Sequence, residues 1–142
     1  MKATVRIGGA CAFIGDSVLG PRQLADVPGM QYLVFDYLAE MTMSAFVQAR
    51  RGNAALGYAT DFVDVALREL LPRCAQRGIK LVANAGGLNP RACAQACEAM
   101  LRKTVVFSLR AEGLDRDNLR AATLTIYGDN DTSATVTLPY SL

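Results

Sequence analysis

The sequence predicts an α/β fold with three layers, in which a mostly parallel sheet carries helices on both faces. Apolar runs alternate along the chain with stretches of helical period, a pattern typical of strand–helix–strand units with parallel strands. Residues 32–35 and 81–83 are apolar throughout, as expected for strands covered on both faces. Near the C-terminus, an alternating pattern around residues 128–131 also allows an antiparallel hairpin.

The individual elements follow from local pattern. Apolar runs bounded by turn residues favour strands, and apolar spacing of three and four favours helices. Proline and glycine mark most of the predicted ends. The predicted strands cover residues 4–7, 32–35, 80–83, 104–109, 122–127 and 135–138, and the predicted helices cover residues 20–27, 41–51, 61–77, 90–101 and 115–121, with Thr60 as an N-cap, Pro72 as an interruption and Gly78 as a stop.

Length and composition indicate one domain, because 142 residues can bury one core but are too few for two ordinary ones. A hydrophobic fraction of 51% and a charged fraction of 20% are typical of a globular chain. The net charge of +2 comes from interspersed signs and forms no basic stripe, and no apolar run approaches the roughly 20 residues of a membrane span. The N-terminus lacks a signal-peptide pattern. We therefore expect a cytoplasmic protein that binds neither nucleic acid nor a membrane.

The strongest local pattern follows the predicted strand at residues 80–83. Asn84, Gly86 and Gly87 predict a tight turn, because glycine reaches positive φ without a steric penalty. Asn89 then stands where a helix N-cap belongs, and Pro90 occupies the first helical position. Backbone N–H groups and the positive end of the helix would face a ligand above the strand.

In a parallel sheet the ligand crevice lies beyond the carboxyl ends of the strands, so polar residues in those loops are the site candidates. A carboxylate at an apolar strand end is costly unless it is paired, solvated or protonated, which favours Asp36 as a site residue. Glu40, four residues on, is the second acid–base candidate. The predicted catalytic residues are Asp36 and Glu40; the predicted ligand-binding residues are Asp16, Ser17, Asn84, Gly86, Gly87, Asn89 and Arg91; Asp61 is a further candidate, and Thr42 is expected to be structural.

Several candidates also have a structural explanation. Asp16 and Ser17 serve equally well as helix caps, and Asn89 is better explained as a cap than as a ligand contact. Glu40 is favourable at a helix start because of the helix dipole alone. Arg91 can clamp a carboxylate or phosphate, or pair with one of the acidic candidates.

The four cysteines and the absence of histidine restrict the chemistry. Without a secretion signal, free buried thiols are expected. The lack of histidine removes Ser-His-Asp and Cys-His mechanisms and the commonest transition-metal ligand. Cys93 and Cys97 fit core packing better than soft-metal binding, and Cys11 is the one thiol considered as reactive, although a small buried loop residue is the better interpretation. No metal is predicted, and no cofactor is identified.

Four blocks of the sequence together resemble a known family. They cover residues 5–17, 32–44, 56–63 and 78–93 and read VRIGGACAFIGDS, YLVFDYLAEMTMS, LGYATDFV and GIKLVANAGGLNPRAC. The chain thereby resembles the N-terminal domain of the acyclic terpene utilisation family over roughly residues 5–100, with residues 103–142 as an unmatched tail. The resemblance implies a role in bacterial breakdown of citronellol and geraniol through acyl-CoA intermediates, by an unassigned reaction. Because family members are longer, it also implies a truncated domain, whose open sheet edge would favour a homo-oligomer.

Two classes of function remain open at this point. In the first, the chain is an enzyme acting on a small organic acid or acyl-CoA thioester, with Asp36 or Glu40 as acid–base group and the turn at Gly86 and Gly87 holding the anionic group. In the second, it is a non-catalytic α/β module that binds a metabolite or a partner chain, and the carboxylates serve the fold.

Overall fold

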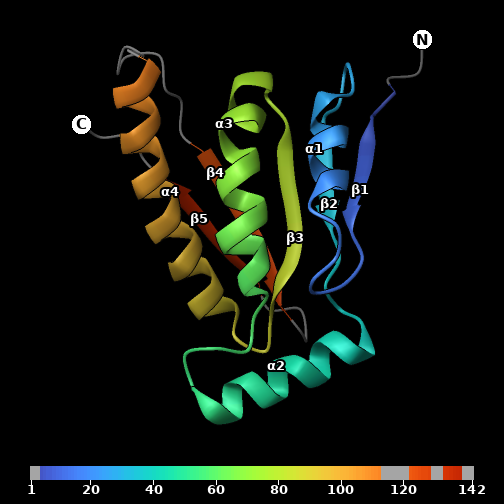
Figure 1. The fold of residues 1–142 in the computed structure, drawn as a ribbon, viewed down its shortest axis with the longest axis vertical. Coiled ribbons are helices and arrows are strands. Elements are labelled where there is room, and N and C mark those ends of the chain that lie inside the picture. The colour runs from blue at the N-terminus through green and yellow to red at the C-terminus, as the bar shows by residue number, and fades with distance from the viewer. Residues whose placement is uncertain (1–3, 113–121, 129–132, 139–142) are drawn as a thin grey trace.

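A five-stranded sheet forms the centre of the computed structural model (Figure 1), which describes residues 4–112, 122–128 and 133–138, with side chains for residues 4–102. The strands lie in the order β1-β2-β3-β4-β5, with β1 to β4 parallel and β5 antiparallel to β4. The α/β class with a mostly parallel sheet is confirmed. The strands are β1 (Ile7–Cys11), β2 (Tyr32–Phe35), β3 (Lys80–Gly87), β4 (Ala122–Gly128) and β5 (Ser133–Leu138).

The described helices that cover the sheet form one layer on one face, and one further helix lies outside that layer (Figure 1). In chain order they are α1 (Leu19–Asp26), α2 (Glu40–Gly52), the π-helical segment η1 (Phe62–Leu67), which continues directly into α3 (Arg68–Arg77), and α4 (Pro90–Glu112). Figure 1 shows α1, α3 and α4 side by side in front of the sheet, while α2 crosses below the carboxyl ends of the strands. The expectation of helices on both faces is not met within the described residues. Right-handed connections between strands that follow one another across a sheet all return over the same face.

Part of the C-terminal region that the sequence predicts as a strand is helical in the structure. The strand predicted at residues 104–109 is wrong, because α4 runs through them to Glu112. An apolar run of this length satisfies strand and helix patterns alike, and no glycine or proline interrupts the chain between Pro90 and Gly113. The helix predicted at residues 115–121 lies outside the described residues, as does the turn at residues 129–132 between the antiparallel strands β4 and β5.

The end of β3 differs from the predicted tight turn. The strand continues through Gly87, because the Ala59 N–H donates to the carbonyl of Ala85 at 2.8 Å and holds this part of the strand extended. Gly87 has φ +47°, and a Cβ there would lie 2.6 Å from Cε2 of Phe46. Phe46 of α2 is 1% exposed. Glycine at position 87 therefore allows α2 to pack directly on the strand.

The helix α3 contains the predicted proline and ends at the predicted glycine. Pro72 lies inside α3, which continues through it to Arg77, and the change of helix type lies earlier, where η1 ends at Leu67. Gly78 closes α3 in the left-handed conformation with φ +67°, and its amide reaches back to the last turn.

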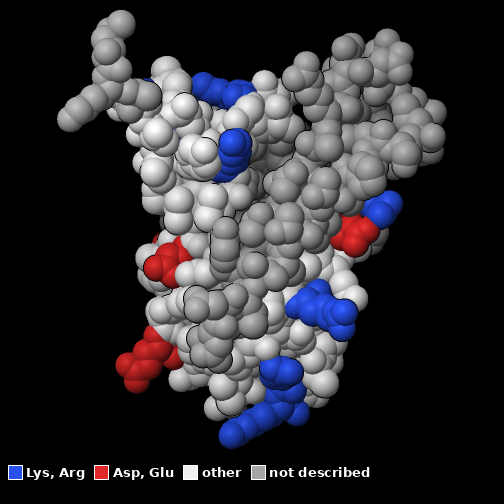
Figure 2. Space-filling view, turned by 180° about the vertical axis from the view of Figure 1, so that it is seen from behind, with Lys and Arg blue, Asp and Glu red and all other residues white. Residues whose placement is uncertain are grey.

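The core lies between the sheet and the helical layer. Phe62 of η1 packs edge-on against Phe35 and Tyr37, with ring centroids 5.2 and 6.1 Å apart. Cys93 and Cys97 are fully buried on α4 as free thiols, so their interpretation as core residues is confirmed. On the opposite face of the sheet, seen in Figure 2, most of the described surface is uncharged.

Candidate functional site

A cavity of about 260 Å³ lies at the carboxyl ends of β1 and β2, between α1, the loop of residues 12–18 and the helix η1–α3. Most of its lining is apolar, and three carboxylates stand around it. We call it the crevice. Its lining residues are Cys11, Gly15, Asp16, Ser17, Val18, Pro21, Phe35, Tyr37, Asp61, Val65, Ala66, Glu69 and Leu70. A more open hollow of about 340 Å³ shares Cys11, Asp16 and Ser17 with it.

Tyr37 and Cys11 form a neutral polar pair in the crevice. Their side chains hydrogen-bond to each other, and the Cys11 thiol also donates to the carbonyl of Phe13 at 3.2 Å. Burial, with the nearby charge of Asp61, raises the pKa of the Tyr37 hydroxyl, and burial raises the pKa of the Cys11 thiol. Both groups therefore stay protonated near neutral pH. Cys11 lacks the lowered pKa of an activated nucleophile.

Asp16 holds the loop that forms one wall of the crevice. Its Oδ2 accepts the Ala12 N–H at 2.9 Å and its Oδ1 accepts the Ser17 N–H at 2.6 Å. The Ser17 hydroxyl accepts the Leu19 N–H at 3.2 Å, at the start of α1. Both residues border the crevice and serve the local backbone at the same time.

Asp61 fastens this loop to the helix across the crevice. Its Oδ2 accepts the Gly15 N–H at 2.8 Å, and its Oδ1 accepts the Phe62 N–H at 3.0 Å at the beginning of η1. The N-cap is thus Asp61, one residue after the predicted Thr60. Each oxygen already has a backbone donor, so the main role of this carboxylate is to join two walls of the crevice.

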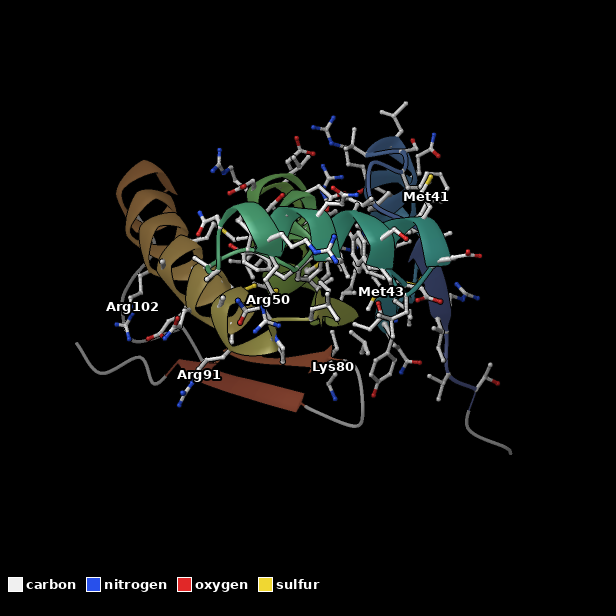
Figure 3. The ribbon with its side chains drawn as sticks, turned by 90° about the horizontal axis from the view of Figure 1, so that it is seen from below. Met41, Met43, Arg50, Lys80, Arg91 and Arg102 are labelled. Carbon is white, nitrogen blue, oxygen red and sulfur yellow. The ribbon has the colours of Figure 1, made fainter. Side chains whose placement is uncertain are left out.

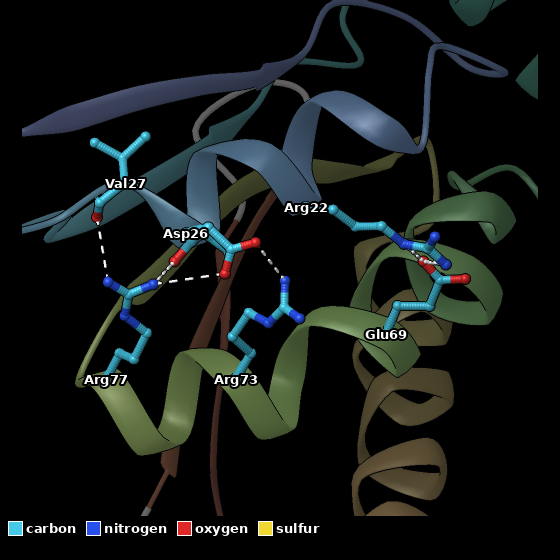
Figure 4. A network of polar contacts seen from close by, with 7 residues as sticks. Arg22, Asp26, Val27, Glu69, Arg73 and Arg77 are labelled. Atoms are coloured by element: carbon cyan, nitrogen blue, oxygen red, sulfur yellow. Dashed lines mark hydrogen bonds and ion pairs between the residues drawn. The ribbon is translucent and has the colours of Figure 1, made fainter.

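Ion pairs join α1 to α3 along the remaining side (Figure 4). Arg22 contacts Glu69 at 2.6 Å, and Asp26 contacts Arg73 at 2.9 Å and Arg77 at 3.7 Å. The hydrogen bond from Arg22 lowers the pKa of Glu69, which keeps this carboxylate ionised and paired at the edge of the crevice. All five side chains are at least partly exposed, so these pairs orient the helices more than they stabilise the fold.

Asp36 and Asn84 form a separate cluster away from the crevice. Asn84 donates through Nδ2 to Asp36 Oδ1 at 2.7 Å and accepts the Tyr37 N–H at 2.6 Å. Phe35 and Tyr37 both pack on Phe62, so Asp36, between them, points to the opposite face of the sheet. Asp36 is exposed, and the cost of burial that favoured it as a site residue is absent.

The glycine segment, residues 84–89, is covered by other side chains and backbone of the same chain. Gly86 and Gly87 are buried and lie outside the crevice lining. Asn89 accepts the Ala92 N–H at 3.4 Å, which confirms it as the cap of α4, and donates to two carbonyls of the preceding connection at 3.1 Å. Arg91 is exposed on α4 (Figure 3) and, within the described contacts, pairs with neither Asp36 nor Asp61.

The predicted residues thus divide into two groups. The structure brings Asp16 and Ser17 together with Asp61, and Thr42 is buried on α2, where its hydroxyl accepts the Ile14 N–H at 3.2 Å. Outside the crevice lining lie Asp36, Glu40, Asn84, Gly86, Gly87, Asn89 and Arg91.

Sequence reasoning missed Tyr37 and Glu69 as residues of the crevice. The position of Tyr37 could have been predicted from strand alternation, since residues 35 and 37 must share a face if the strand continues. The position of Glu69 could not, because it depends on how α3 packs against α1.

Two kinds of feature are absent from the described part of the chain. Among those residues, no group of three or more cysteine, aspartate or glutamate side chains is placed to hold a metal ion. None of the described helices combines the length and apolarity needed to cross a bilayer.

Comparison with known proteins identifies the family. A model described as acyclic terpene utilisation family protein AtuA matches residues 5–133. Neither a curated protein nor a solved structure matches the chain. The matched span continues beyond residue 102, where the resemblance was expected to end. Since it covers most of the 142 residues, the chain belongs to the acyclic terpene utilisation family.

Proposed function

We propose that the crevice binds the hydrocarbon part of an acyclic terpenoid, in its alcohol or acyl-thioester form. Membership of the family suggests a role in acyclic terpene utilisation. The observation that supports a binding role is the crevice itself, a small and mostly apolar cavity at the carboxyl ends of parallel strands.

The size and lining of the crevice favour a short branched hydrocarbon. At about 260 Å³ it lies just below the roughly 300–1,000 Å³ of common ligand cavities, which suits a small ligand. Val18, Val65 and Leu70 offer aliphatic surface, and burying apolar ligand area yields about 25 cal/mol per Å². In an acyl-CoA thioester, the acyl chain would enter and the nucleotide would remain outside.

The charges around the crevice favour a neutral head group. Asp16 and Asp61 contribute carboxylates, and within the described residues no lysine or arginine lines the cavity. A free terpenoid acid would bring a further negative charge close to these carboxylates, which is unfavourable. An alcohol or a thioester carbonyl avoids this repulsion. We therefore favour these forms over the small organic acid considered from sequence.

The polar groups of the crevice suit recognition of oxygen. Tyr37 and Cys11 remain protonated, so the Tyr37 hydroxyl can donate to a ligand oxygen in place of its bond to Cys11, and the Cys11 thiol can do so in place of its bond to the Phe13 carbonyl. Neither Tyr37 nor Cys11 has the lowered pKa of an activated nucleophile. A binding module is accordingly favoured over an enzyme, and acid–base catalysis by Asp36 or Glu40 stays a separate prediction.

Thermal unfolding with geraniol and with geranate at neutral pH tests this proposal. A ligand at about 100 times its Kd stabilises the folded state by about 2.7 kcal/mol, which raises Tm by several degrees. We expect geraniol to raise Tm and geranate to have little effect. Ala66→Phe, which fills the crevice, should abolish the shift, whereas Ala45→Phe on the exposed side of α2 should retain it. Failure of geraniol to shift Tm, or an unchanged shift with Ala66→Phe, would refute the proposal.

A further inference from the structure

The strand β1 lies at one edge of the sheet with its outer side uncovered. The strand order places it first, paired only with β2 among the described strands. Figure 1 shows β1 outermost, beyond α1, with no described element farther out. Its outer backbone groups therefore have no partner strand within the described chain, which is the usual template for pairing with another chain.

The hydrogen bonds of Arg6 fix which backbone groups face outward. Its N–H donates to the side chain of Gln31, and its carbonyl accepts the N–H groups of Gln31 and Tyr32, so both groups point toward β2. Backbone direction alternates along a strand, and the register continues as Ile7↔Tyr32 and Gly8↔Leu33. Gly8 thus also points its amide and carbonyl at β2. Ile7 and Gly9 present theirs to the open edge.

The same two residues have complementary shapes on the open face of the sheet. The side chain of Ile7 is 61% exposed. At Gly9, nothing lies within 4 Å of the position that a Cβ would occupy. Ile7 is therefore a projecting apolar group. Gly9 lies two residues along on the same face and leaves open space above its backbone, into which an apolar side chain can fit.

We propose that two copies of this chain pair through antiparallel β1 strands about a two-fold axis at Gly8. This register sets Ile7 of one copy opposite Gly9 of the other, and each such pair exchanges both N–H···O bonds, because these are the outward-facing groups. Each Ile7 side chain covers the empty place above the opposite Gly9. The contact is self-complementary, as a two-fold interface requires.

The first residues of the edge lack two of the usual protections against such pairing. Proline and outward lysine, which block edge strands in many proteins, do not occur between residues 5 and 11. The one charge in this stretch belongs to Arg6, whose guanidinium donates to the carbonyl of Pro28 and is turned away from the edge. The irregularity between Gly9 and Cys11 ends the regular strand and limits the pairing to its first residues.

Sedimentation velocity over a wide concentration range, with a matched pair of variants, tests the proposal. We expect the wild-type chain to shift from monomer to dimer as concentration rises. Ile7→Lys should keep it monomeric, while Met41→Lys, at an exposed site of 66% on α2, should dimerise like the wild type. Circular dichroism of both variants verifies that they are folded.

Amide hydrogen exchange of the unmodified protein gives an independent readout. The N–H groups of Ile7 and Gly9 should exchange slowly at high concentration and quickly after dilution, while the Gly8 N–H, which points to β2, should change little. A monomer at every concentration, a dimer that survives Ile7→Lys, or a dimer with unprotected Ile7 and Gly9 amides would each overturn the proposal. This result does not depend on the ligand of the crevice.

Discussion

The loop of residues 12–17 and the segment of residues 84–89 look alike in sequence but serve opposite purposes in the structure. Both follow parallel strands, and both contain glycine and polar residues. In the first, Asp16 and Asp61 bind the backbone N–H groups and the loop borders a cavity. In the second, Gly87 is covered by Phe46, and the strand end is bonded to residues 57–59. Glycine at a strand end allows another group to approach the backbone closely. In some proteins that group is a ligand, and at Gly87 it is the Phe46 side chain.

The difference between the two segments is decided by a distant element. Local pattern assigns a ligand role to the second segment more readily than to the first. The helix α2, placed across the strand ends, packs Phe46 against Gly87, whereas the loop of residues 12–17 borders the cavity. The four predictions that follow disturb one segment at a time.

The largest effect is expected for Gly87→Ala. The new Cβ would clash with the Phe46 ring and would require a left-handed backbone at a residue with a side chain. Overpacking of a core costs about 1–3 kcal/mol and the left-handed conformation about 1–2 kcal/mol, so we expect a loss of about 3 kcal/mol in urea unfolding.

Gly52→Ala serves as the control for this change. Position 52 ends α2 and has nothing within 4 Å of a new Cβ, so its effect should be near zero. Partial recovery of stability by combining Gly87→Ala with Phe46→Leu would identify the ring as the obstacle. Equal stability of the Gly87→Ala and Gly52→Ala variants would contradict the account of the buried segment.

The next effect concerns the cap at Asn89, which ends the same segment. Asn89→Ala removes the cap and both bonds to the carbonyls of Ala54 and Leu56, for an expected loss of about 2 kcal/mol in chemical unfolding. Asn89→Asp keeps the capping oxygen and should recover part of that loss. If Asp and Ala at this position proved equally destabilising, the residue would not act as a cap.

A smaller change in stability but a larger change in binding is expected for Asp61→Asn. Asparagine can still cap η1 but has one acceptor oxygen, so the Gly15 N–H loses its partner, at a cost of about 1 kcal/mol. Amide exchange at Gly15 should become fast, and the geraniol-induced rise in Tm should fall sharply. The folded fraction of Gly87→Ala should still bind. Loss of geraniol binding in Gly87→Ala, with an unchanged rise in Tm for Asp61→Asn, would instead place the ligand at residues 84–89.

The smallest effect is expected for Arg22→Gln at the side of the crevice. The hydrogen bond from Arg22 lowers the pKa of Glu69 in the folded chain. This contribution is present above the ordinary glutamate pKa and is lost as pH falls through the lowered value. Tm measured as a function of pH should therefore decline less between neutral and acid pH in the variant than in the wild type. Identical acid profiles would show that the pair contributes nothing in solution.

Much of the fold follows from local chemistry. The cap at Asn89, the stop at Gly78 and the continuous apolar character of residues 32–35 predict elements that the structure contains. These predictions succeed because each depends on the chain's own backbone conformation or on burial of one short run. The free thiols on α4 follow in the same way from their spacing on an apolar helical face.

The failures share a different cause, which is dependence on tertiary packing. Residues 104–109 satisfy two patterns, and the helix already running from Pro90 decides between them. The single helical layer depends on strand order, which no local pattern states. Asp36 lies among apolar residues in sequence but is exposed in space, so the desolvation argument that favoured it does not apply. Tyr37, its neighbour, faces the crevice instead.

Amide chemical-shift mapping during a titration with geraniol tests the central claim most directly, because it locates the ligand without any substitution. The crevice predicts the largest shifts at Gly15, Asp16 and Ala66, with little change at Asn84, Gly86 and Gly87. Shifts concentrated at Asn84 to Gly87, with an unperturbed loop and helix η1, would contradict it.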